Sequence, residues 1–334
     1  MKRQRVALAL IALLLLAIFS LTRLFRIYEQ TPADCTDGLL QSLASRGLLF
    51  HFIVSILPFD LKQRRAIESV LRHHPDACVV LHVRETLSLL PVQTAVLQLR
   101  SVNYCAFIRR YSLANALGSL MHSGDTVLER AAANFSSGVR KYARGPHWYS
   151  HQTDFMRLYL MYEFGGWYLD TDVIVVAKLD GIVNALGKQA PDGMSTHNEK
   201  VVYLNGCVMN FSKSNSFTKW ALREFLILYN DKVWGANGPE LLSDLAQRID
   251  VCQYTFNNSC ILNVLPTEAF QLIHFTNMSN ALNALRMEFG NTTYAFHYNN
   301  KIVHDELERP SASRDTLRYQ LFNDYCVLCS EEVL

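Results

Sequence analysis

The sequence predicts an α/β fold in which a mostly parallel sheet is flanked by helices. Between residues 48 and 108, strand-like runs alternate with helix-like runs, which is the pattern of a parallel sheet covered on both faces. A second unit, a helix followed by two glycines and a buried strand, spans residues 151–176. The chain has 334 residues, 50% of them hydrophobic, and can therefore bury a sizeable core.

The first half of the sheet follows from three apolar runs, at residues 48–57, 77–83 and 102–108. Between the first two, residues 60–73 carry apolar side chains at helical spacing, which predicts an amphipathic helix. No Gly-x-Gly-x-x-Gly follows the first strand, which argues against a dinucleotide fingerprint. In a sheet of this kind, ligands bind beyond the carboxyl ends of the strands.

Residues 151–176 carry the most information. Apolar residues at helical spacing predict a helix with its N-cap at Thr153, ended by Gly165 and Gly166. Residues 167–176 are then aromatic and β-branched, which predicts a mostly buried strand.

Two carboxylates, Asp170 and Asp172, interrupt this strand. In extended backbone, residues two apart point to the same side, and two buried like charges are costly unless a cation compensates them. A hard divalent metal would do so and keep positions free for phosphate oxygens, although an Asp-x-Asp also occurs by chance in turns. Asp154 and Arg157 share a face of the preceding helix, either as a surface ion pair or as ligands of sugar hydroxyls.

The combined pattern, Asp-x-x-Arg, a short helix and Gly-Gly-x-Tyr-x-Asp-x-Asp, resembles the donor-binding core of retaining α-1,4-galactosyl- and α-1,4-N-acetylglucosaminyltransferases. The resemblance implies a GT-A-like fold, a UDP-sugar donor and a divalent cation, Mn²⁺ or Mg²⁺. It also implies that Asp172 ligates the metal, that Asp170 shares this site and contacts the ribose or sugar, and that Asp154 and Arg157 hold the donor sugar. Tyr168 is expected to line the donor site.

The resemblance extends to two elements further along. Residues 201–210 predict another buried strand, in which Asn205 and Gly206 are expected to line the site. A Gly-x-Asn-Gly-Pro element at residues 235–239 precedes an apolar helix, and its Asn237 serves either catalysis or the structure of the loop.

A third element, residues 294–301, is similar to a His-x-Trp-Asn-Lys motif near the C-terminus of these enzymes, with Asn299 in place of the tryptophan. His297 would ligate the metal, contact the diphosphate or be structural. Lys301 would neutralise charge on the leaving group.

Residues 1–26 differ from the rest of the chain. Basic residues flank an uncharged run from Val6 to Thr22, which is short for a membrane span. Positive charge on its N-terminal side predicts a single-pass type II signal-anchor in the Golgi membrane, with a cleaved signal peptide as the alternative. Residues 27–47 are then expected to form a stem, and residues 48–334 a luminal catalytic domain.

Cysteines and glycosylation motifs agree with a luminal domain. The eight cysteines are an even number compatible with disulfides. The close pairs Cys252/Cys260 and Cys326/Cys329 are the expected local bridges, although the full connectivity does not follow from the sequence. Asn210 belongs to a fifth Asn-x-Ser/Thr motif, inside an apolar run. Glycosylation is expected at the other four, Asn134, Asn257, Asn277 and Asn291.

Together, these features predict a metal-dependent retaining glycosyltransferase that moves galactose, N-acetylgalactosamine or N-acetylglucosamine to a glycan acceptor, such as a glycolipid, in α-1,4 linkage. An Asp-x-Asp phosphohydrolase and a non-catalytic glycan-binding relative are the alternatives. The net charge of +2, from 32 basic and 30 acidic residues, gives no electrostatic case for nucleic acid. A homodimer is left open.

Overall fold

The computed structural model describes residues 36–55, 59–189, 203–249, 251–253, 261–308 and 313–329. Two compact units divide the chain, residues 1–40 and 41–334. The predicted membrane anchor lies outside the described residues, and the predicted stem includes helix α2 (Asp37–Ser45). Among the helices that the structure describes, none has the length and apolar character needed to cross a membrane.

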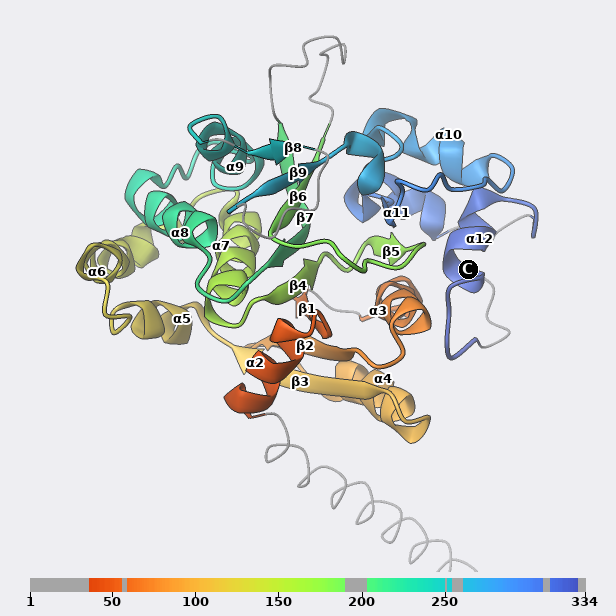
Figure 1. Cartoon of the computed structure of the whole chain (residues 1–334), viewed down its shortest axis with the longest axis horizontal. Helices are drawn as coiled ribbons and strands as arrows, with labels where there is room; N and C mark the ends of the chain where they lie inside the picture. Colours follow the sequence, from red (N-terminus) through yellow and green to blue (C-terminus); the bar gives the residue numbers. More distant parts are fainter. Residues whose placement is uncertain are drawn as a thin grey trace, which may run out of the picture. The chain divides into compact units, whose positions relative to one another are not determined.

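The second unit is built on an eight-stranded sheet with the order β3-β2-β1-β4-β7-β6-β9-β8 (Figure 1). The first four of these strands are parallel to one another. Strand β7 is antiparallel to both of its neighbours, and β6, β9 and β8 are again parallel. The mostly parallel sheet is therefore confirmed. Its strands are β1 (Leu49–Val54), β2 (Cys78–Arg84), β3 (Cys105–Tyr111), β4 (Gly166–Leu169), β6 (Ala185–Lys188), β7 (Leu204–Phe211), β8 (Cys252–Gln253) and β9 (Asn263–Leu265).

Helices cover both faces of this sheet (Figure 1). On one side, α7 packs on β4 and β7, α9 packs on β7, and α8 packs on α7. Helices α3 and α4 lie on the other side, where α3 contacts β5. The helices are α3 (Leu61–His73), α4 (Leu90–Ser101), α5 (Leu113–Leu120), α6 (Thr126–Tyr142), α7 (Trp148–Glu163), α8 (Ser216–Leu228), α9 (Pro239–Ala246), α10 (Met278–Asn283), α11 (Asn300–Leu307) and α12 (Leu317–Asn323), with short 3₁₀ turns at Thr267–Ala269 and Phe275–Asn277.

Local sequence signals set the first strand–helix–strand unit. The Asp60 carboxylate accepts a hydrogen bond from the Gln63 N–H, and the Gln63 side chain accepts one from the Asp60 N–H. This capping box starts α3 where the sequence predicts it.

The disulfide bonds confirm part of what the cysteine spacing predicts. The predicted Cys326–Cys329 bridge is present. A further bridge, Cys78–Cys105, joins the paired first residues of β2 and β3. The Cys252/Cys260 pair lies outside the side chains that the structure describes.

Helix α7 and the strand after it differ from the prediction. Helix α7 begins at Trp148, so Thr153 is not its N-cap, and the Thr153 hydroxyl donates instead to the Tyr149 carbonyl inside the helix. The continuous strand predicted over residues 167–176 is also wrong, because β4 ends at Leu169 and β5 (Val173–Val175) pairs antiparallel with β10 (Ala295–His297) in a separate small sheet.

The break in the strand has a hydrogen-bonding cause. The Asp170 N–H still donates to the Cys207 carbonyl on β7, at 2.8 Å, but the Val173 N–H turns back to the Asp170 carbonyl, at 3.2 Å. A turn therefore satisfies the backbone groups around the Asp-x-Asp motif. The two carboxylates are consequently presented by a turn and not by an extended strand.

The asparagines of the glycosylation motifs differ in their exposure to solvent. Asn134, Asn277 and Asn291 are exposed, whereas Asn257 lies outside the described residues. Asn210 is buried in β7, where its side-chain oxygen accepts a hydrogen bond from the Asn184 N–H. Asn210 is therefore no acceptor for a glycan in the folded chain.

Gly166 allows β4 to start directly beside β1. Its φ of +90° lies in the left-handed region, and a Cβ built on it would come within 2.7 Å of the Leu49 carbonyl oxygen. Only glycine fits both conditions. The second glycine of the helix stop is therefore required by the approach of two strands.

We expect the substitution Gly166→Ala to lower the free energy of unfolding by about 3 kcal/mol, since a positive φ costs about 1–2 kcal/mol and overpacking about 1–3 kcal/mol. Gly181→Ala is the matched control, because Gly181 has a φ of +78° but open space around its Cβ position. Urea denaturation of both variants measures the difference. Equal losses would show that contact with Leu49 does not constrain this position.

Candidate active site

The Asp-x-Asp turn lies at the carboxyl edge of the sheet. Strand β1 pairs in parallel with β2 on one side and with β4 on the other, so the strand order reverses at β1. In open α/β sheets the crevice at such a switch point is the usual place for a ligand. Asp170 directly follows the last residue of β4 and is therefore placed at this edge.

Three side chains at the turn can hold a cation. Ligand atoms of Asp170, Asp172 and His297 all lie within 4.8 Å of one another. His297 joins the aspartates because β10 pairs with β5, and its Nε2 lies 3.2 Å from Asp172 Oδ1. Two carboxylates and an imidazole suit a divalent ion such as Mn²⁺, so the residues present fit the metal that the resemblance implies.

Neighbouring groups orient these three side chains. The Asn300 N–H donates to Asp172 Oδ2 at 2.9 Å, and Gln271 Nε2 lies 2.6 Å from His297 Nδ1. Partners of this kind fix the ring that faces a metal. Gln271 lies next to the site and was missed in the sequence, because it belongs to no motif and reaches His297 only through the fold.

The charges of Asp172 and His297 are matched. Burial opposes the charged form of each group, yet the pKa of Asp172 is lowered because His297 and the Asn300 N–H stabilise its carboxylate. Burial likewise opposes the charge on His297, but Asp172 holds the pKa of this imidazole well above its ordinary value. Each of the two groups therefore favours the charged form of the other.

Asp154 and Arg157 face the aspartates and are not a surface pair. Arg157 Nη2 lies 3.5 Å from both Asp154 Oδ1 and Asp170 Oδ1. Its guanidinium also lies over the ring of Tyr168, whose hydroxyl donates to Asp170 Oδ1 at 2.5 Å. Four predicted site residues, Asp154, Arg157, Tyr168 and Asp170, thus form one connected group.

Together with Asp172 and His297, this group forms a cluster that carries an excess of negative charge. Burial raises the pKa of Asp154 to about 6, against the lowering effect of Arg157, and Asp170 raises it further. The pKa of Asp170 is also raised, first by burial and then by Asp172, with Arg157 opposing. Three carboxylates thus share one guanidinium and one imidazole, and a bound cation would relieve their repulsion.

Two buried polar atoms in or next to this cluster have no hydrogen-bond partner among the described residues. They are Arg157 Nε and Asn300 Oδ1. Buried polar groups normally have a hydrogen-bond partner. Unpaired ones beside a candidate cation site therefore indicate where a ligand would supply the missing hydrogen bonds. Both residues flank the aspartates, one on the side of α7 and the other on the side of α11.

Glycines make room for the charged side chains. A Cβ on Gly206 would lie 3.1 Å from Arg157 Nη1, and a Cβ on Gly238 would lie 2.8 Å from Asp154 Oδ1. Gly206 thus contacts this group, whereas the sequence predicts Gly238 only as part of the loop that precedes a helix. Asn205 is turned toward Gln189, to which its Nδ2 donates at 2.6 Å.

Asn237 has the contacts of a loop residue. Its Oδ1 accepts from the Asn230 N–H, and its Nδ2 donates to the Asn230 carbonyl. The same Nδ2 lies 3.1 Å from His151 Nδ1. These bonds use the hydrogen-bonding groups of Asn237 and support the structural alternative for this residue.

Lys301 and Asn299 lie at the start of α11. Lys301 is exposed, and its Nζ lies 5.8 Å from the centre of the Trp234 ring. Asn299 has a φ of +53°, a left-handed conformation that asparagine tolerates better than tryptophan does. Asn299, which replaces the tryptophan of the His-x-Trp-Asn-Lys motif, is thus the residue that precedes α11.

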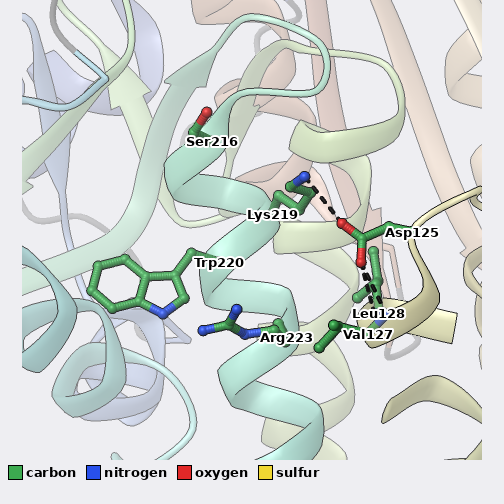
Figure 2. Close-up of a pocket in the computed structure, with 7 residues that line it drawn as sticks. All are labelled: Asp125, Val127, Leu128, Ser216, Lys219, Trp220 and Arg223. Carbon is green, nitrogen blue, oxygen red and sulfur yellow. Dashed lines mark hydrogen bonds and ion pairs between the residues drawn. The ribbon is translucent and has the colours of Figure 1, made fainter. Parts of the chain in front are cut away.

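A separate pocket of about 320 Å³ lies between the start of α6 and α8 (Figure 2). There Lys219 forms an ion pair with Asp125, which also caps α6 through the Val127 and Leu128 N–H groups. None of the predicted site residues lines this pocket. Its lining residues are Asp125, Val127, Leu128, Ser216, Lys219, Trp220 and Arg223.

Two family models match the chain. A glycosyltransferase sugar-binding region containing the DXD motif matches residues 60–191, which include Asp170 and Asp172, and an α-1,4-glycosyltransferase conserved region matches residues 210–333. Together with the geometry above, these matches define a protein of the Asp-x-Asp glycosyltransferase class.

Relatives narrow the class to a family. The lactosylceramide 4-α-galactosyltransferase of Pongo pygmaeus is 31% identical over 180 residues, which cover 52% of this chain and 77% of the relative. An uncharacterized protein of Arabidopsis thaliana is 28% identical over 287 residues, 82% of this chain and 40% of the relative. The chain therefore belongs to the α-1,4-glycosyltransferase family.

The matches do not extend over whole proteins. The chain spans about half the length, or less, of most of the curated relatives that it matches. Among solved structures, mouse xyloside xylosyltransferase 1 aligns with 76% of this chain and 97% of its own, at 13% identity and a TM-score of 0.43.

Proposed function

We propose that the chain transfers a hexose or N-acetylhexosamine from a UDP-sugar to a glycan acceptor in α-1,4 linkage, with Mn²⁺ or Mg²⁺ and with retention of configuration. One observation carries the proposal. Asp170, Asp172 and His297 converge within 4.8 Å at the carboxyl edge of the sheet, beside the partly buried Arg157 that bridges Asp154 and Asp170.

Each part of the cluster has a task in this reaction. Asp170, Asp172 and His297 would hold the cation, which acts as a Lewis acid toward the leaving diphosphate. Asn300 and Gln271 keep Asp172 and His297 in place. Among the described residues at the site, none stands out as a covalent nucleophile, and we therefore propose a displacement on the front face of the donor.

The donor sugar is assigned to the α7 side of the cluster. Arg157 Nε is an unused donor, and the Asp154 carboxylate fixes the guanidinium, so these two residues can hold sugar hydroxyls in one orientation. Lys301, which is exposed at the start of α11, is assigned to the departing diphosphate.

Similarity to a lactosylceramide 4-α-galactosyltransferase supports UDP-galactose as the first donor to test, and a glycolipid with a terminal lactosyl group as the first acceptor. UDP-N-acetylgalactosamine and UDP-N-acetylglucosamine are the next donors. A type II anchor in the Golgi membrane stays part of the proposal. Protease digestion of sealed microsomes that removes the C-terminal region would count against it.

In the presence of Mn²⁺ and without acceptor, we expect the purified full-length chain in detergent to hydrolyse one UDP-sugar slowly. Removal of the metal with EDTA should abolish release of UDP, and added Mn²⁺ should restore it, because the leaving diphosphate then regains its Lewis acid. Luminescent assays of the released UDP or GDP, over a panel of UDP- and GDP-sugars, measure this. Absence of metal-dependent binding or turnover with every donor would instead support the glycan-binding alternative.

The phosphohydrolase alternative is not retained. The family model that matches residues 60–191 accounts for the Asp-x-Asp motif as part of a sugar-binding region.

A further inference from the structure

Trp234 belongs to a loop that is fixed against the α7 side of the site. His151 Nε2 lies 3.2 Å from the carbonyl oxygens of both Val233 and Trp234. Four residues after Trp234, Gly238 packs so closely on Asp154 that a Cβ would come within 2.8 Å of its carboxylate. The backbone of Trp234 is therefore held at a defined place beside the donor-sugar residues.

The indole of Trp234 lies near the start of α11. Lys301, whose Nζ lies 5.8 Å from the centre of this ring, directly follows Asn300, and the Asn300 N–H donates to Asp172. The ring thus connects two chain segments that flank the cluster, the loop before α9 and the start of α11. Trp234 therefore lies near Lys301 at the start of α11, and four residues before Gly238, which packs on Asp154.

Trp234 is exposed, in contrast to the loop that carries it. Its exposed fraction is 52%, whereas Gly235, Asn237 and Gly238 are buried. A flat indole held by a buried backbone offers an apolar face and an N–H donor at little cost in conformational freedom. The C–H face of a pyranose complements the electron-rich face of such a ring.

We propose that Trp234 is the platform on which the terminal sugar of the acceptor glycan stacks; this rests on the proposed glycosyltransferase function. The donor sugar is assigned to the pair Asp154 and Arg157, so the exposed ring near the start of α11 is left for the second sugar. That sugar enters from solvent and must lie beside the anomeric carbon. Lys301 approaches the ring and helps to position it.

A bilayer contact is the competing explanation. Val233 and Ile302 are also exposed large apolar residues beside Trp234 and Lys301. A membrane surface would use all three apolar side chains and would affect only acceptors embedded in a bilayer. A sugar platform needs the indole alone and acts on soluble acceptors as well.

The experiment compares Trp234→Ala and Trp234→Phe with two controls, Ile302→Ala and Trp220→Ala. Trp220 lines the separate pocket of Figure 2, and both controls should leave donor hydrolysis and soluble transfer unchanged. Each full-length variant is assayed with UDP-galactose and Mn²⁺. The acceptors are octyl β-lactoside in solution and lactosylceramide in phosphatidylcholine vesicles, and free and transferred galactose are measured together.

Trp234→Ala should raise the KM for octyl β-lactoside about tenfold, which corresponds to the loss of one stacking contact of about 1.4 kcal/mol. The ratio of free to transferred galactose should rise by a similar factor. Trp234→Phe should restore part of the KM and part of this ratio.

Two results would overturn the proposal. One is an equal loss of hydrolysis and transfer in Trp234→Ala, which would mean a purely structural role. The other is a defect confined to vesicles and shared by Ile302→Ala, which would mean a bilayer contact. Failure of the wild-type chain to hydrolyse any donor would instead refute the proposed function itself, so the two failures are distinguishable.

Discussion

Replacement of Asp172 by asparagine is expected to lower glycosyl transfer and donor hydrolysis by roughly 100-fold or more, since loss of a residue that only orients a metal ligand already costs about 10–100-fold. Asp172 is the best placed of the predicted ligands, because one oxygen faces His297 Nε2 and the other accepts from the Asn300 N–H. Asparagine keeps the shape and one acceptor but removes the charge. Isothermal titration of UDP with and without Mn²⁺ should therefore show loss of the metal-dependent part of nucleotide binding.

The stability of this variant separates a metal-binding role from a structural one. Asp172 is only partly buried, and asparagine can still accept from Asn300, so we expect the free energy of unfolding to fall by no more than about 1–2 kcal/mol. Asp180→Asn is the matched control, because Asp180 is an exposed aspartate whose Oδ1 lies 3.7 Å from His74 Nδ1. A large loss of stability with Mn²⁺-dependent UDP binding intact would contradict the metal assignment.

Local signals account for the part of the fold that the sequence predicts well. The strands β1, β2 and β3 and the helix α3 follow from short-range periodicity and from the capping box at Asp60. The positions of Asp154 and Arg157 on one face of a helix also follow from spacing alone. Interactions of this kind join residues that are only a few positions apart, so they can be predicted from a single sequence.

Contacts between residues far apart in the chain account for the parts of the site and fold that the sequence does not predict. His297 reaches Asp172 only because β10 pairs with β5, more than a hundred residues earlier. Gln271 and Gly238 enter the site through the same kind of contact. The error at residues 167–176 has the same origin, since the apolar pattern continues past Asp170 while the backbone changes sheets.

Replacement of Arg157 by methionine is expected to lower the free energy of unfolding by about 3 kcal/mol at pH 7. Removal of one partner of a buried ion pair typically costs about 3–5 kcal/mol, and the lower value applies here because Asp170 is only partly buried. Methionine fills much of the same volume, so most of the loss is electrostatic: Asp154 and Asp170 would lose the guanidinium that stabilises their charged forms. Urea denaturation measures the loss. Arg223→Met is the control, since Arg223 is partly exposed and pairs with its neighbour Glu224, and it should change stability by no more than about 0.5 kcal/mol.

The pH dependence of this loss tests its electrostatic cause. Burial already raises the pKa of Asp154 from 3.8 to about 6 while Arg157 opposes the rise, so removal of Arg157 should raise the folded-state pKa further and leave the unfolded value unchanged. A group whose pKa is raised by folding binds a proton more tightly in the folded state, and its destabilising charge disappears as the pH falls below the folded pKa. The deficit of Arg157→Met should therefore shrink between pH 7 and pH 5, and Asp154→Asn should recover part of it at pH 7. A deficit that stays constant over this range would show that Arg157 acts through packing, and the charge-based account of the donor site would then lose its main support.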